Sequence, residues 1–399
     1  MKEVNGPVLM KATYDEPFAE LLSKYLNEPI CKVKYESFQG PGDPMPNSPY
    51  TFGCETKPTI LESVRGRHVF LVGSVWNTNH ELFQTMLIAS AAKHTGKAKK
   101  VTYVPLYLPY SREEKTDSRR GPPSMKTVLM CLKTCGVDET LILDLHSEES
   151  EGTFGGNDAP DAELLWSEPL AADYISRKHT EGVPENKLEE TLSQLKVLAP
   201  DFGAMKDCTD QAVEINKLQG YTDNPEDGPV QAMLCGKTRS KDDNSTHSRG
   251  VYDQGRNNDE DVGNVKDDIL ASAGTLITSS SDFKASGFSK INAFITHGFG
   301  FDKWGNSFFV NYEDSDIDSL TVTNSHPYFQ ERFRVHLASM EDRARAQSLA
   351  ERIDIMDVSP FIGEVMRRIL VGGQTIREMI NEYPDRRSLY NIIKGTDLL

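Results

Sequence analysis

The sequence predicts an α/β protein made of two similar halves, each a mostly parallel β-sheet flanked by helices. Short apolar runs alternate with stretches of helical period from about residue 67 onward, and the same alternation resumes in the second half. The 399 residues exceed one ordinary domain and fit two or three. Hydrophobic residues make up 38% of the chain, which is enough to fill such cores and argues against a disordered chain. We place the boundary near residue 165, which gives halves of residues 1–165 and 166–399.

The first half is expected to hold a βαβαβ series. Apolar runs of strand length occupy residues 68–75, 99–110 and 138–146. Between them, residues 79–96 and 123–136 carry apolar side chains at helical spacing, and the second of these stretches has prolines at its start and a glycine at its end. Strands that alternate with helices in this way form parallel sheets.

The second half repeats the pattern. We expect strands at residues 195–201, 229–236 and 290–298, and helices at 206–220 and 273–287.

The remaining segments are expected to be loops and one surface helix. Residues 39–50, 238–264 and 301–316 are rich in polar residues, proline or glycine, and they show no regular period. The run just before Asp267 is too polar to predict a good strand. Residues 334–353 have the composition of an exposed helix.

The charge balance disfavours several classes of partner. The chain carries 44 basic and 60 acidic residues, a formal charge of −16. Such a chain repels nucleic acid and anionic membranes, so any phosphate site must depend on local cations or Mg²⁺. The six cysteines form no CxxC pair, and no apolar run is long enough for a membrane span. We therefore expect a cytoplasmic protein with reduced thiols and neither a nucleic-acid nor a membrane partner.

The sharpest local pattern is DDILASAGT, residues 267–275, at the entrance to an expected helix. Two carboxylates at a strand end can accept hydrogen bonds from the 2′ and 3′ hydroxyls of a ribose. The Ser-Ala-Gly-Thr turn that follows offers backbone N–H groups and hydroxyls at a helix N-terminus, which suits an anion. An ordinary acidic turn with a helix cap is the alternative interpretation.

Other polar segments follow the expected strands in a fixed order. They are Arg112–Asp117 in PYSREEKTDSRR, Asp144-Leu145-His146, Ala199-Pro200-Asp201, and Lys237-Thr238-Arg239, all ahead of the acidic loop. Together these segments resemble the ribose-phosphate pyrophosphokinase (PRPP synthetase) family, from about residue 50 to the C-terminus.

The resemblance implies two tandem type I phosphoribosyltransferase-like domains, with the last segment packing back on the first. The residues that it implies for the ATP site are Phe52, Glu55, Arg112, Glu113, Glu114, Asp117 and His146. Those implied for the sugar phosphate are Asp201, Asp267, Asp268, Ser272, Ala273, Gly274 and Thr275. Those implied for Mg²⁺ are Asp144, His146, Asp158, Asp161 and Asp201. Lys237 and Arg239 are the implied catalytic cations, on a loop that closes over the transferred group.

The activity implied by the resemblance is transfer of the β,γ-diphosphate of ATP to the anomeric hydroxyl of ribose 5-phosphate. Mg²⁺ is the expected metal and ATP the co-substrate, because such transfer depends on positioning and charge neutralisation. The family's habit of assembly predicts a homo-oligomer, either a dimer or a hexamer.

Departures from the family pattern leave alternatives open. Ala271-Ser272 stands where the family loop has an Asp-Thr pair, and Glu113-Glu114 where it has Gln-Asp. These changes raise a second hypothesis, a larger acceptor such as ADP-ribose, which divergent phage-type relatives use in NAD resynthesis, while ribose 5-phosphate stays the first expectation. A phosphoribosyltransferase would share the acidic loop but needs no ATP site. A non-catalytic regulatory subunit is the remaining alternative.

Overall fold

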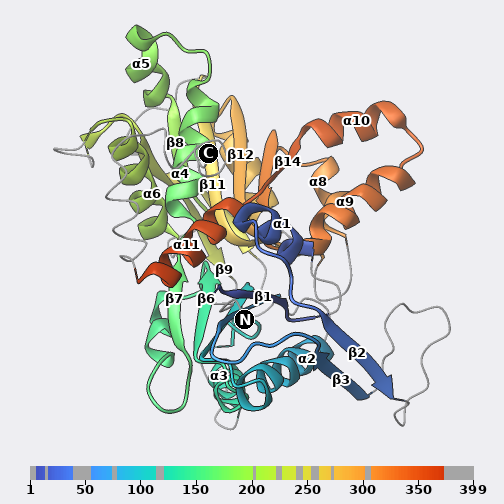
Figure 1. The fold of residues 1–399 in the computed structure, drawn as a ribbon. Helices are drawn as coiled ribbons and strands as arrows, with labels where there is room; N and C mark the ends of the chain where they lie inside the picture. Colours follow the sequence, from blue (N-terminus) through green and yellow to red (C-terminus); the bar gives the residue numbers. More distant parts are fainter. Residues whose placement is uncertain are drawn as a thin grey trace. The chain divides into compact units, whose positions relative to one another are not determined.

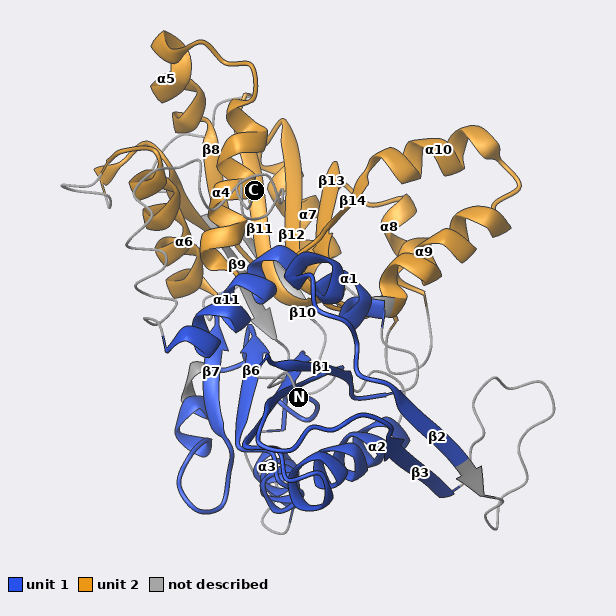
Figure 2. Ribbon diagram, viewed as in Figure 1, with its two compact units in different colours: residues 1–166, 359–374 blue, residues 167–358, 375–399 orange. Residues whose placement is uncertain are grey.

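The computed structural model describes residues 6–13, 17–38, 55–73, 79–113, 121–200, 204–221, 227–239, 246–252, 260–270, 274–301 and 307–372. The chain divides into two compact units (Figure 2). Unit 1 comprises Met1–Trp166 and Ser359–Gln374, and unit 2 comprises Ser167–Val358 and Thr375–Leu399.

Unit 1 is built around a five-stranded sheet in the order β1-β4-β5-β6-β7 (Figure 1). All of its strand pairs are parallel, as expected for strands joined through helices. A separate antiparallel pair joins β2 to β3. The elements are β1 (Val8–Lys11), α1 (Pro17–Leu26), β2 (Val33–Phe38), β3 (Glu55–Ile60), β4 (His68–Val72), α2 (Asn79–Ser90), the π-helical turn η1 (Ala91–Thr95), β5 (Lys100–Leu106), α3 (Ser124–Thr134), β6 (Glu139–Leu143), the 3₁₀ turn η2 (Glu148–Thr153), β7 (Asp161–Leu165) and α11 (Ser359–Val371).

Helices α2 and α3 bury one face of this sheet. Val69 and Val101 of the sheet lie in one buried cluster with Ile88 of α2 and Leu132 of α3. Burial of these side chains supplies most of the free energy that holds the layer together, at about 25 cal/mol per Å² of apolar surface.

Helix α11, the last helix in the part of the chain that the structure describes, packs against α1 within unit 1. The contact depends on Gly363, because a Cβ added there would lie 2.3 Å from Cδ1 of Tyr25. Only glycine lets the two helices approach so closely.

Unit 2 has a seven-stranded sheet in the order β10-β9-β8-β11-β12-β13-β14. Its strand pairs are parallel except for β10 with β9. The elements are α4 (Glu168–Thr180), η3 (Glu185–Lys187), α5 (Leu188–Ser193), β8 (Leu195–Ala199), α6 (Met205–Leu218), β9 (Gln231–Arg239), β10 (Thr246–Tyr252), β11 (Val262–Leu270), α7 (Gly274–Ala285), β12 (Lys290–Gly298), α8 (Phe308–Glu313), β13 (Ser319–Thr323), α9 (Pro327–Ser339), α10 (Arg343–Glu351) and β14 (Ile353–Met356).

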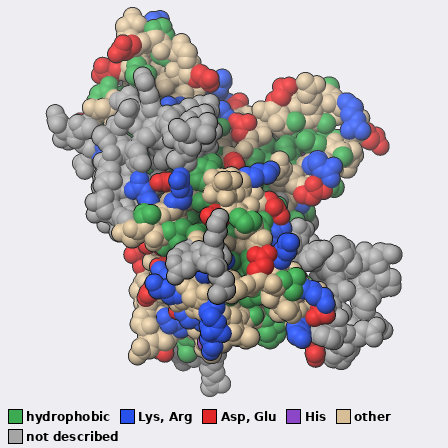
Figure 3. All heavy atoms as spheres, viewed as in Figure 1, with side chains coloured by type: hydrophobic (Ala, Val, Ile, Leu, Met, Phe, Trp, Pro, Cys, Tyr) green, Lys and Arg blue, Asp and Glu red, His purple; other side chains and the backbone are tan. Residues whose placement is uncertain are grey.

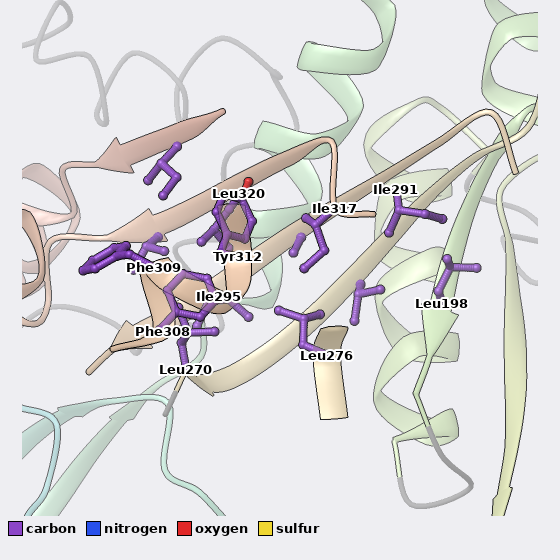
Figure 4. Packing of buried hydrophobic residues seen from close by; sticks show 14 of the residues in the cluster. Leu198, Leu270, Leu276, Ile291, Ile295, Phe308, Phe309, Tyr312, Ile317 and Leu320 are labelled. Carbon is purple, nitrogen blue, oxygen red and sulfur yellow. The ribbon is translucent and has the colours of Figure 1, made fainter. Parts of the chain in front are cut away.

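The core of unit 2 lies between this sheet and helices α7 and α8. Figure 4 shows Ile295 and Leu320 from the strands meeting Leu276 of α7 and Phe308 of α8. The prediction of an α/β chain with mostly parallel sheets flanked by helices is therefore confirmed.

Arg352, between α10 and β14, ties the short helix α8 to the core. Its Nη1 donates to the carbonyl of Glu313 at 3.0 Å. Its Nη2 donates to the carbonyl oxygens of Ile317 at 2.6 Å and Ser315 at 3.2 Å. The guanidinium also lies 4.7 Å from the ring centroid of Tyr312. One side chain thus satisfies several carbonyls at the end of α8.

Replacing Arg352 by alanine is expected to lower the unfolding free energy by about 2–4 kcal/mol, because buried carbonyls lose a charged donor. The midpoint of thermal unfolding should fall by roughly 5–15 °C, measured on the full chain by circular dichroism. Arg343→Ala, at an exposed position of α10, is the matched control and should shift the midpoint by only about 1 °C. Equal shifts in both variants would contradict the role given to Arg352.

Three expectations for loops and helices were wrong. Residues 238–264 include strand β10 and the start of β11, and the polar run before Asp267 belongs to that nine-residue strand. Residues 301–316 contain the helix α8, whose aromatic side chains are buried. The expected helix at 334–353 is two helices. The first, α9, ends at Ser339, and Asp342 caps the second by accepting from the N–H groups of Ala344 and Arg345 at 3.0 and 3.1 Å.

Candidate active site at the carboxyl ends of the strands

In unit 1, the candidate ATP residues follow two neighbouring parallel strands. Arg112 and Glu113 come after β5, and His146 comes after β6. Because β5 pairs with β6 in parallel, these segments leave the same edge of the sheet. All three side chains are exposed. The loop after β5 is anchored by Tyr110, whose hydroxyl donates to Oδ1 of Asn79 at 2.7 Å.

The backbone turns sharply where β6 ends. Asp144 is buried and has a left-handed φ of 45°, a conformation that aspartate tolerates better than most residues. Its N–H donates to the carbonyl of Leu165 at 2.8 Å. This turn separates buried Asp144 from exposed His146, so the two residues differ in their access to a ligand.

The residues proposed for Mg²⁺ are divided by the structure. Asp158 and Asp161 lie at the amino end of β7, whereas His146 follows the carboxyl end of the parallel strand β6. The length of the strand places Asp161 roughly 13 Å from that edge. These two aspartates therefore do not join His146, which corrects the expectation for them.

Among the residues that the structure describes, no three His, Cys, Asp or Glu side chains group as metal ligands. Mg²⁺ usually keeps several waters and takes one or two protein ligands beside substrate phosphates. The exposed imidazole of His146 suits one ligand position of such a partly hydrated ion.

In unit 2, the acidic pair lies within the carboxyl end of the central strand β11. Oδ1 of Asp267 accepts from the N–H of Asp268 at 3.0 Å. Burial, followed by the charge of Asp268, raises the pKa of Asp267 to about 7. Helix α7 begins at Gly274, and Gly274 and Thr275 are exposed at its N-terminus. The carboxylates and the helix N-terminus are thus close together in the chain at one edge of the sheet.

The segment after β12 closes against the end of β11. The N–H groups of Phe299 and Gly300 donate to the carbonyl of Leu270 at 2.9 and 3.3 Å. Arg332 of α9 donates to the carbonyl of Phe299 at 2.6 Å, and its guanidinium lies 4.6 Å from the ring centroid of Phe301. A guanidinium over an aromatic ring is therefore linked through Phe299 to the carboxyl end of β11.

A buried polar network supports the same edge and was missed by the sequence analysis. Oγ of Ser325 donates to the carbonyl of Thr296 at 2.9 Å, and Nδ1 of His297 lies 2.9 Å from that Oγ. Oγ1 of Thr323 donates to the carbonyl of Thr296 at 2.6 Å. The signal was present in the sequence, since THG and VTNS directly follow apolar runs.

The structure describes some of the other candidate residues but not all of them. Glu55 is the exposed first residue of β3, in the two-stranded pair of unit 1. Lys237 and Arg239 belong to β9, opposite Ser248 and Thr246 of β10. The candidates that lie outside the described residues are Phe52, Glu114, Asp117, Asp201, Ser272 and Ala273.

A raised pKa at Asp267 predicts opposite pH effects on binding and stability. The folded chain holds more protons than the unfolded chain between the ordinary pKa of 3.8 and about 7, so this group adds stability as the pH falls through that range. Binding of the expected sugar should weaken over the same fall, because the ionised carboxylate accepts hydroxyl hydrogen bonds on both oxygens and more strongly than the protonated acid. The KM for the acceptor, measured between about pH 6 and 8.5 with ATP saturating, should rise on the acid side. A KM that is flat with pH would contradict this assignment.

The surface charge is mixed on the face that Figure 3 draws. On the face drawn in Figure 3, Lys and Arg side chains are interspersed with Asp and Glu over the coloured surface. Within the described ranges, no helix combines the length and apolar character needed to cross a bilayer.

The chain is similar to known proteins along most of its length. The family model described as the N-terminal domain of ribose phosphate pyrophosphokinase matches residues 8–136. The ribose-phosphate pyrophosphokinase of Aquifex aeolicus is 26% identical over 373 residues, which cover 92% of this chain and 97% of the relative. Ribose-phosphate pyrophosphokinase 2 of Schizosaccharomyces pombe is 25% identical over 318 residues, or 79% of this chain and 83% of the relative. The crystal structure of phosphoribosylpyrophosphate synthetase from Mycobacterium smegmatis shares the fold, with a TM-score of 0.68 and 19% identity over 92% of this chain and 100% of that one. The chain is thus similar to ribose-phosphate pyrophosphokinases along most of its length, as a divergent relative at about 26% identity.

Proposed function

We propose that this protein is an ATP-dependent diphosphotransferase that converts ribose 5-phosphate and ATP to phosphoribosyl pyrophosphate and AMP. The observation that carries the proposal is the arrangement at the centre of the unit 2 sheet. Asp267 and Asp268 lie at the end of β11, and helix α7 begins at Gly274. Carboxylates suit vicinal hydroxyls, and a helix N-terminus suits the 5′-phosphate of the same sugar.

ATP, Mg²⁺ and the transferred diphosphate would be bound by different side chains of the protein. Arg112 would contact the phosphates of ATP, and His146 would hold Mg²⁺ with Asp144 nearby. When bound, Mg²⁺ would neutralise charge on the β- and γ-phosphates. Lys237 and Arg239 would place cationic charge on the transferred group as it leaves AMP.

The reaction is a substitution at the β-phosphorus of ATP. A bond forms between the anomeric oxygen and that phosphorus, while the bond to the bridging oxygen of AMP breaks. The hydroxyl proton is released to water. Because the residues act mainly by positioning and charge, none needs to form a covalent intermediate.

A second acceptor, ADP-ribose, is favoured by two observations. Ala271-Ser272 replaces the Asp-Thr pair of the family loop, which removes a carboxylate from the sugar 5′ end. Arg332, which lies over the ring of Phe301, donates to the carbonyl of Phe299, and the N–H of Phe299 donates to the carbonyl of Leu270 at the end of β11. A cation on an aromatic ring suits a further phosphate or a base. A non-catalytic regulatory subunit is the remaining alternative.

Comparison of acceptors tests these proposals. The purified protein is incubated with Mg-ATP and either ribose 5-phosphate or ADP-ribose, and AMP release and product mass are followed. A diphosphate gained by ribose 5-phosphate supports the main proposal, and a gain by ADP-ribose alone supports the second acceptor. Absence of AMP with both sugars would leave the regulatory subunit as the better explanation.

The resemblance to ribose-phosphate pyrophosphokinases supports a cytoplasmic homo-oligomer, either a dimer or a hexamer. Sedimentation equilibrium of the purified protein checks the assembly, and a monomer at micromolar concentration would contradict it.

A further inference from the structure

The central strand β11 contains a lysine where a buried parallel strand normally has an apolar residue. Lys266 directly precedes Asp267 and Asp268, and only 10% of its side chain is exposed. Its Nζ forms an ion pair with Oε1 of Glu168, whose side chain is 27% exposed. A lysine is buried to this degree only when a partner offsets the loss of hydration, so the pair is a built feature of the fold.

Glu168 is itself held at the level of the acidic pair. It is the first residue of α4, and the preceding Ser167 is buried with its Oγ 2.8 Å from Oγ1 of Thr296 on β12. The carbonyl of Thr296 belongs to the buried network with Thr323. The N-terminus of α4 is therefore joined to β12 through Ser167 and to β11 through the ion pair, and these two contacts hold Glu168 beside Lys266.

Charged groups near Asp267 and Asp268 have opposite effects on the ionisation of these two carboxyl groups. Asp267 and Asp268 repel each other, and this repulsion disfavours ionisation of both. Lys266 is the nearest cation on the same strand and opposes that repulsion. Glu168 on α4 forms the ion pair with Lys266 and partly offsets its positive charge. His297 on β12 is opposite Ile269, two residues from Asp267. The first two turns of α7, residues 274–281, add no titratable side chain.

We propose that Lys266, held in place by Glu168, is a positioning residue for the acceptor sugar: it keeps the Asp267–Asp268 pair ionised and aligned to accept hydrogen bonds from vicinal hydroxyls. The inference rests on the proposed function for the identity of the acceptor. It adds a group that touches neither substrate and acts through the two carboxylates. The alternative is that Lys266 and Glu168 serve only the stability of the fold.

Direct binding separates these roles and does not depend on turnover. Ribose 5-phosphate and ADP-ribose are titrated calorimetrically into the full-length protein across about pH 5.5 to 9. In the Lys266→Met variant, the Kd of the preferred sugar at neutral pH should rise roughly tenfold. The pH below which sugar binding weakens should be about one unit higher than in the wild type. Lys266→Arg should bind within about threefold of the wild type, because the charge is kept.

The controls make the outcome decisive. Glu168→Gln removes the negative charge that partly offsets Lys266. The pH below which sugar binding weakens should therefore be lower than in the wild type. Lys284→Met removes the lysine of a partly exposed pair with Asp318 and should leave sugar binding unchanged. ATP binding should stay the same in all variants that fold.

Two results would overturn the inference. One is a Lys266→Met protein, or a Glu168→Gln protein if the first does not fold, that loses thermal stability but keeps the wild-type pH profile of sugar binding. The other is a wild-type protein that binds neither sugar. Sugar binding without diphosphate transfer would instead refute the proposed function and leave the role of Lys266 open to the same titration.

Discussion

Replacing both Asp267 and Asp268 by asparagine is expected to lower kcat/KM for the acceptor sugar by roughly 10²–10⁴-fold. Each carboxylate would lose a charge-assisted hydrogen bond to a hydroxyl, worth about 1.5–3 kcal/mol. The two losses act on the same sugar and should nearly add, while the KM for ATP stays within about twofold. Steady-state kinetics with each substrate varied in turn measures both effects.

The same double variant should unfold at a higher temperature than the wild type above about pH 8. Burial makes the ionised form of Asp267 costly to the fold, and asparagine removes that charge. Asp316→Asn, which changes an aspartate that accepts from Oγ of Ser281 at 2.6 Å, is the control and should alter neither acceptor kinetics nor stability strongly. Loss of acceptor activity together with lower thermal stability would show that the acidic pair is structural.

Replacing Lys237 by alanine is expected to lower kcat by roughly 10²–10³·⁵-fold, with a small change in either KM. A cation that contacts the transferred group mainly in the transition state contributes about 3–5 kcal/mol, by analogy with oxyanion donors and arginine fingers. Arg239→Ala should have an effect of the same size. Rapid-quench measurement of a single turnover reports the chemical step directly.

The double variant of Lys237 and Arg239 distinguishes catalysis from substrate capture. If the two cations act on one transition state, their effects on kcat should fall short of additive. Lys217→Ala, in an exposed pair with Glu214 on α6, is a control that should leave kcat unchanged. A rise in the KM for ATP at constant kcat would contradict the catalytic role, because it indicates binding shared by ground and transition states.

Much of the fold followed from the sequence because several of the parallel strands are buried apolar runs followed by a helix of clear period. The run around Val69 and the helix containing Ile88 are good examples, since both enter one buried cluster. Arg112 and His146 lie at one edge of the sheet because the parallel strands that precede them end at a common edge.

Strands were not predicted where buried residues are polar. The start of β11 looked like a loop because Asn264 and Lys266 are polar, yet Asn264 is buried and Lys266 is paired with Glu168, 98 residues away. No local pattern reveals a partner at that distance. Helix α8 was missed for a related reason, since six residues are too few to establish a helical period.

The candidate site was predicted in its segments but not in all of its geometry. Asp158 and Asp161 lie near the His146 segment in the chain, but β7 begins at Asp161 and runs parallel to β6, which puts the two aspartates at the opposite edge. The network of Thr296 and Ser325 depends on side chains from adjacent strands and could not be inferred from either segment alone.

The most direct test follows the γ-phosphorus of ATP. The protein is incubated with Mg²⁺, ribose 5-phosphate and ATP labelled at the γ position, and the labelled products are separated and identified. Diphosphate transfer predicts label in the sugar product with formation of an equal amount of AMP. Label in a sugar monophosphate ester with formation of ADP, or label only in inorganic phosphate, would contradict the proposed reaction.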